Sequence, residues 1–177
     1  MQLLRYIIST AALGSAASAF VAQAKRPAMP RDGRFAFPQH LTINHRDGQG
    51  PLSNCDDSSF NGATDSKAPL VKDCVALMAE QLAMGYTKYG IDGFGDPPTW
   101  FKIAEHGTCK FSLKPVEGPG WGGDGDSLLW WFGNKDMADL LRDSIAQFEK
   151  DGRVAADGRL GCDGVYSGYP LLWKISS

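Results

Sequence analysis

The chain has 177 residues, enough for one domain with a hydrophobic core and too few for two comfortable ones. Hydrophobic residues make up 43% and charged residues 21%, so most of the chain should fold. The net charge of −2 argues against a nucleic-acid-binding protein, which usually carries a basic stripe, and gives no polybasic signal for an anionic membrane. The composition also excludes a collagen, a coiled coil and a polytopic membrane protein.

The first 19 residues have the pattern of a secretory signal peptide. Arg5 supplies a positive start, residues 6–13 are mostly apolar, and Ala17 and Ala19 flank Ser18 as a small-x-small cleavage site. A membrane anchor would need roughly 18 or more strongly apolar residues, and this stretch is diluted by polar ones. We therefore predict a secreted, extracellular protein without stable membrane insertion.

Residues 20–54 show little periodic hydrophobicity and contain four prolines. Short strands at residues 35–37 or 41–43 fit the sequence, but the segment as a whole is predicted to be an extended or mobile leader. The compact domain is predicted to begin near Cys55 and to occupy residues 55–177.

Two segments have the period of an amphipathic helix. The first runs from Leu70 to Leu82, with Pro69 in its opening turn and Gly85 at its end. In the second, an apolar stripe runs from Met137 to Phe148, and the opposite face is charged, as expected for a solvated surface. Asn134 is the predicted N-cap of this helix and Asp136 favours its positive end.

The other segments alternate with a period of two. Residues 100–114 predict a hairpin, residues 127–132 a short internal strand, and residues 159–175 a second hairpin. Trp100 and Trp173 lie in these alternating strands and are predicted core residues. The simplest arrangement that buries all the apolar stripes is an antiparallel sheet with two helices packed on one face, an α+β fold.

Four cysteines, an even number in a chain predicted to be exported, indicate two disulfides. The cysteines are Cys55, Cys74, Cys109 and Cys162. Their spacing contains no Cys-x-x-Cys, which argues against zinc, and a nucleophilic thiol would leave an unpaired partner behind. Three connectivities are possible, and the shorter loops favour Cys55–Cys74 with Cys109–Cys162.

No arrangement of residues predicts catalysis or a cofactor. Residues 118–123 fit a G-x-G-x-x-G string but lack the flanking strand and helix that a nucleotide site needs. Asp124 and Asp126 offer oxygen ligands without the remaining spacing of a calcium loop. No triad or G-x-S-x-G motif is visible. The chain is therefore predicted not to be an enzyme, although enzymatic activity is not excluded.

The glycine-rich segment is instead a candidate contact surface. Trp121 combines a large apolar area with a hydrogen-bond donor, and Asp124 and Asp126 follow it closely. We predict that these three residues contact a partner. A sugar would suit the same tryptophan.

Several motifs, taken in order, resemble the secreted fungal necrosis-inducing factors, a family of extracellular effector proteins. The resemblance lies in residues 55–60, 68–74 and 107–111, continues through residues 136–148 and 152–162, and ends with Trp173. The four cysteines are the only functional residues of the family that can be assigned to individual positions of this chain. The leader and the insertion at residues 118–126 depart from the compact family pattern.

This resemblance implies a small disulfide-braced monomer that binds a host target, a protein or cell-surface component of a plant, and provokes cell death. It also implies a distant likeness to a fungal killer toxin with an α/β sandwich. The alternatives are a toxin-like antagonist of microbes that acts on a membrane channel and a carbohydrate-binding module.

Overall fold

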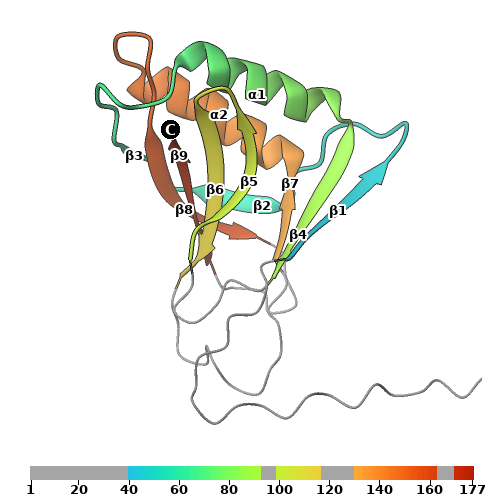
Figure 1. The fold of residues 1–177 in the computed structure, drawn as a ribbon. Helices are drawn as coiled ribbons and strands as arrows, with labels where there is room; N and C mark the ends of the chain where they lie inside the picture. The colour runs from blue at the N-terminus through green and yellow to red at the C-terminus, as the bar shows by residue number, and fades with distance from the viewer. Residues whose placement is uncertain (1–39, 93–98, 117–129, 163–169) are drawn as a thin grey trace, which may run out of the picture. The chain divides into compact units, whose positions relative to one another are not determined.

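The computed structural model describes residues 40–92, 99–116, 130–162 and 170–177 (Figure 1). The predicted signal peptide, residues 20–39 of the predicted leader, and the predicted contact residues Trp121, Asp124 and Asp126 lie outside these ranges.

The described residues form two helices and nine strands. In chain order the elements are β1 (His40–Arg46), β2 (Cys55–Ser58), β3 (Asn61–Gly62), α1 (Val71–Ala83), β4 (Tyr86–Asp92), β5 (Phe101–His106), β6 (Cys109–Pro115), β7 (Trp130–Gly133), α2 (Asn134–Phe148), β8 (Ala156–Cys162) and β9 (Pro170–Ser176).

The strands form two antiparallel sheets. Sheet A has the order β1-β4-β7, and sheet B has the order β2-β8-β9-β6-β5, with β3 also paired to β8. Both predicted hairpins are present, as β5-β6 and β8-β9. The helices run side by side and cover the same side of the sheets (Figure 1).

Both sheets share one hydrophobic core with the helices. Phe111 of β6 stacks on Phe132 of β7, with ring centroids 5.5 Å apart, and on Trp173 of β9 at 6.4 Å. Leu77 of α1 and Leu141 of α2 are fully buried in the same cluster. Burial of side chains of this size stabilises a fold by roughly 1.5–3 kcal/mol each, so these contacts hold the sheets together.

The sequence predicts both helices within a few residues. Helix α1 starts after Pro69 and Leu70, and Gly85, with φ of +64°, follows its C-cap, as a residue with no Cβ can do readily. Helix α2 begins one residue earlier than predicted. Gly133 is its N-cap, so the predicted N-cap residue, Asn134, is instead a buried residue of the first turn.

The predicted leader is partly wrong. Its residues 40–46 form β1, which pairs in register with all of β4, and the chain from Leu52 to Asn54 bonds to α2. The folded part therefore begins before Cys55. The expected α+β fold with two helices is confirmed, with the difference that the predicted single sheet is two sheets around one core.

Candidate functional site

Two disulfides join distant parts of the chain, and their pairing differs from the predicted one. Cys55 lies opposite Cys162 in the pairing of β2 with β8 and is bonded to it, and Cys74 of α1 is bonded to Cys109 of β6. The predicted pairs, Cys55–Cys74 and Cys109–Cys162, are wrong because tertiary contacts, not loop length, bring the thiols together: the register of β2 on β8 for one pair and the packing of α1 on β6 for the other. All four sulfurs are used in these bonds, so none is left as a nucleophile or metal ligand.

Asn134 is a buried polar hub that connects three segments. Its Oδ1 accepts hydrogen bonds from the backbone N–H of Leu52 at 3.0 Å and of Thr87 at 3.3 Å. Its Nδ2 donates to the carbonyls of Gln81 at 2.6 Å and Gly85 at 2.7 Å. One side chain thus satisfies four backbone groups at the end of α1, the start of β4 and the segment before β2.

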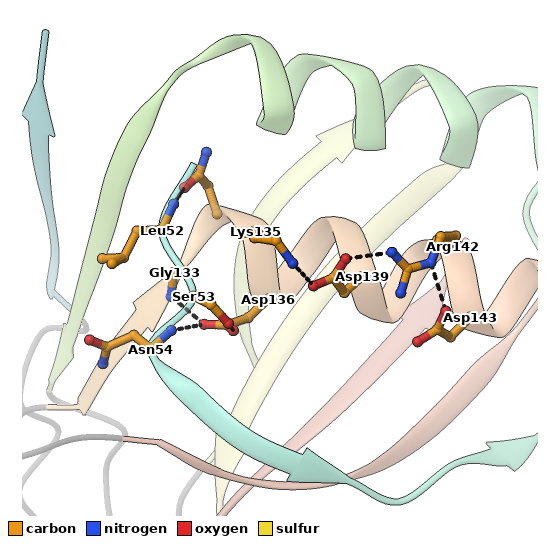
Figure 2. Close-up of polar contacts among 10 residues, drawn as sticks. Leu52, Ser53, Asn54, Gly133, Lys135, Asp136, Asp139, Arg142 and Asp143 are labelled. Atoms are coloured by element: carbon orange, nitrogen blue, oxygen red, sulfur yellow. Dashed lines mark hydrogen bonds and ion pairs between the residues drawn. The ribbon is translucent and has the colours of Figure 1, made fainter. Parts of the chain in front are cut away.

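Asp136 fastens the same segment to the N-terminus of α2 (Figure 2). Its carboxylate accepts hydrogen bonds from Ser53 Oγ at 2.5 Å, Asn54 N at 2.8 Å and Gly133 N at 3.0 Å. Burial raises the pKa of this carboxyl above its usual value, although the hydrogen bonds from Ser53, Asn54 and Gly133 act in the opposite direction. The role of the residue is structural, since every neighbour it binds is part of the scaffold.

A groove of about 550 Å³ lies between β2 and α2 and is lined by Asp56, Asp57 and charged residues of the helix. On the helix, Lys135 bonds Asp139 at 2.5 Å, and Arg142 bonds both Asp139 and Asp143 at 2.8 Å (Figure 2). Such partly exposed pairs contribute little to stability, and the face agrees with the predicted solvated surface. Of its helix carboxylates, Asp139 and Asp143 are paired with Lys135 and Arg142, whereas Asp136 is held by the hydrogen bonds described above.

The face of sheet B opposite the helices carries a second cavity. Trp100, predicted as a core residue, is 37% exposed and lies on this face, so that prediction is wrong. The ammonium of Lys174 lies 4.4 Å from the centroid of its ring. Trp100, Lys174 and Leu172 help to line a pocket of about 450 Å³, which also includes Asp157 and Ser177.

Alternation along the strands could have revealed this position. Phe101 and Leu113 are in register and belong to the core, so Trp100 and Lys102 on either side of Phe101 face outward. The same alternation that predicts the strand therefore places Trp100 on its outer side, opposite to the predicted core position.

The described histidines do not form a catalytic arrangement. His45 bonds the hydroxyl of Thr87 at 3.2 Å and the exposed carboxylate of Asp47 at 3.0 Å, but Thr87 is fully buried, so its hydroxyl does not face a substrate. His106 bonds Glu80 at 2.7 Å on the surface. Within the described ranges, no group of three or more His, Cys, Asp or Glu side chains is placed to hold a metal ion. Among those same residues, neither helix has the length and apolarity to cross a bilayer.

The chain belongs to the Hce2 family, described as "Pathogen effector; putative necrosis-inducing factor", whose family model matches residues 54–162. The match runs from the residue before Cys55 to Cys162, so the two cysteines of one disulfide mark its two ends. It includes both helices and Asp136 with its partners Asn54 and Gly133, whereas Ser53, β1 and β9 lie outside it. The resemblance seen in the sequence is therefore confirmed, and membership of this family together with two disulfides is typical of extracellular proteins.

The chain is also similar to a curated protein of Penicillium expansum named "Probable chitinase LysM18". The two are 29% identical over 125 residues, which cover 70% of this chain and 8% of that protein. The chain therefore spans a small part of that relative's length.

Proposed function

We propose that this protein is a secreted fungal effector that acts by binding a component of a host plant and provokes cell death there. The observation that carries the proposal is the coincidence of the family match with the disulfide-closed scaffold over residues 54–162. A small domain held by two disulfides resists unfolding and proteolysis outside the cell, as a protein acting at a distance from its producer requires.

Binding rather than catalysis is favoured by the surfaces. The exposed carboxylates of α2, Asp139 and Asp143, are paired with cations of the same helix, and the cysteines are all oxidised. The hydroxyl beside His45 belongs to the fully buried Thr87. What the described surface offers instead is a pocket beside Trp100 with polar groups around it. The partner is expected to be a plant protein or cell-surface component, bound by a monomer without a cofactor.

Leaf infiltration tests the proposal. Purified oxidised protein should cause cell death in at least some genotypes of a plant panel, and a Cys55→Ser/Cys162→Ser variant should lose activity faster in apoplastic fluid. Absence of any response in all genotypes, together with no retention of plant proteins or wall material, would refute the proposal. Mass spectrometry of the protein secreted by its natural producer would establish where the mature chain starts.

A second candidate function is antagonism of other microbes. It is favoured by the relative from P. expansum, whose name refers to chitin, a polymer of fungal cell walls. In this case the domain would work on competing fungi as a toxin-like factor or a carbohydrate-binding module. Growth inhibition of fungi with no effect on leaves would support this function, and absence of both inhibition and chitin retention would exclude it.

A further inference from the structure

The outer face of sheet B is positively charged on a negatively charged chain. We define this outer face by the seven charged residues of β5, β6, β8 and β9 that alternate with core residues along these strands. They are Lys102, Lys110, Lys114, Arg159, Lys174, Glu105 and Asp157. The definition leaves out β2, at the edge of the sheet, with its exposed Asp56 and Asp57. Five cations and two carboxylates leave a surplus of three positive charges, whereas the whole chain has a net charge of −2. A local excess of this kind attracts anionic partners.

Both carboxylates on this face already have protein partners. Glu105 Oε1 lies 2.6 Å from Lys102 Nζ, which lowers the pKa of that carboxyl, and Asp157 Oδ1 accepts a hydrogen bond from Asn61 at 3.1 Å. They therefore hold neighbouring side chains in place and do not form an acidic site of their own.

The cations are spread over the face. Lys102, Ser112 and Lys174 lie in one row across β5, β6 and β9, and this row continues to Asp157 of β8. Neighbouring strands are about 4.8 Å apart, which places the backbones of Lys102 and Lys174 about 10 Å from each other. A single small anion would need converging cations, whereas this spacing suits a polymer with repeated negative charges.

The pocket beside Trp100 provides a place for one ring of such a polymer. The indole, the side of Leu172 and the hydroxyl-bearing Ser176 and Ser177 line it. The C–H face of a sugar can pack on the indole, and hydroxyls and charged groups at the rim can bond its hydroxyls. The indole is 37% exposed, and its contact with the ammonium of Lys174, which belongs to β9 on the other side of β6, holds it over the sheet.

We propose that the outer face of sheet B binds an extended, carboxylate-bearing polysaccharide, with one sugar ring on Trp100 and the carboxylates along the lysines. This inference rests on the proposed function, because it names the chemical class of the host component that the effector binds.

Affinity electrophoresis of the full oxidised protein in gels containing polygalacturonate tests the inference. We expect retardation that weakens as salt is raised, because the contacts are ionic and exposed. Methyl-esterified polygalacturonate retains the rings but not the charges, and should retard the protein at least fivefold less. Equal retardation by both polymers, or none by either, would overturn the inference, as would preferential binding to phosphatidylserine vesicles or chitin.

Matched variants locate the surface. Lys174→Gln/Arg159→Gln and Trp100→Ala should each weaken binding by roughly tenfold. Lys72→Gln/Lys150→Gln makes the same change in charge near the helices and should bind as the unmodified protein does. Trp100→Phe keeps an aromatic ring and should bind more tightly than Trp100→Ala. Equal loss in both charge-changing pairs would mean that net charge alone drives binding, and would contradict the assigned face.

Different results would refute the proposed function and this inference. Leaf cell death without binding to polygalacturonate would overturn this inference and leave the proposed function standing. Binding to polygalacturonate without any leaf response in any genotype would support the inference and refute the role in cell death.

Discussion

Cys55 faces Cys162 across the antiparallel pairing of β2 with β8, and the disulfide between them joins residues 107 positions apart. The bond connects the start of the family-matched region to its end. Because β8 also pairs with β9, the strand between β8 and β6, this bond fixes β2 to strands that come from much later in the chain.

Loss of this bond should destabilise the protein more than loss of the other. Closing a loop of 107 residues restricts the unfolded chain by roughly 4–5 kcal/mol, and closing one of 35 residues by roughly 4 kcal/mol. Cys55→Ala/Cys162→Ala should therefore lower the free energy of unfolding at least as much as Cys74→Ala/Cys109→Ala in denaturant titrations. Peptide mapping without reduction should recover Cys55 linked to Cys162, and a peptide linking Cys55 to Cys74 would contradict the structure.

Replacement of Asn134 should be among the most damaging changes in a polar residue. Asn134→Ala removes a hydrogen-bond partner from each of four buried or partly buried backbone groups, and a group left unsatisfied costs about 1–3 kcal/mol. We expect a loss of about 3–5 kcal/mol in thermal or denaturant unfolding. Asn44→Ala, on the exposed part of β1, is the control and should change stability by less than about 0.5 kcal/mol. Similar unfolding midpoints for the two variants would show that the hub is not formed.

The features that could be predicted from the sequence are those with a local period of hydrophobic residues. The stripe from Met137 to Phe148 defines α2 because its spacing alone identifies the buried face, and the alternation in residues 109–113 defines β6. Strand β1 carries only a short signal of this kind, at residues 41–43. Among the described strands it pairs with β4 alone, and Ile43 is 52% exposed, so its place in the sheet depends mainly on backbone pairing.

The site depends on contacts between distant segments, which no local pattern contains. Asn134 looked like a helix cap because asparagine commonly occupies that position, yet its partners are Leu52, Gln81, Thr87 and Gly85. The disulfide pairing required the register of β2 on β8. In contrast, the outward position of Trp100 was predictable, because neighbouring residues of a strand face opposite sides and Phe101 faces the core.

Gly158 should not tolerate even the smallest side chain. A Cβ at this position in β8 would lie 1.8 Å from the carbonyl oxygen of Ser59 and 2.9 Å from Trp173 Nε1. Since both neighbours are held by the sheet and the core, Gly158→Ala should cost about 3 kcal/mol or more. Gly161→Ala in the same strand is the matched control, because the nearest atom to its Cβ is Asp56 Oδ2 at 4.0 Å. Equal unfolding midpoints for the two variants would contradict the close approach of Ser59 to β8.

Asp136 should impose a specific pH dependence on stability. Burial raises the pKa of its carboxyl in the folded protein above the unfolded value of 3.8, so the ionised form opposes folding at pH values above the folded pKa. As the pH falls through the folded pKa toward 3.8, the folded state takes up the proton first, and this group's contribution to stability rises.

Asp136→Asn isolates this effect because the amide does not titrate. At neutral pH the variant should be less stable by about 1–3 kcal/mol, since its NH₂ group faces the N–H donors of Gly133 and Asn54. The difference in unfolding free energy between the unmodified protein and the variant should widen in favour of the unmodified protein as the pH is lowered from 7 toward 4. A difference that stays constant or shrinks over that range would mean that the carboxyl of Asp136 is not buried against residues 53 and 54.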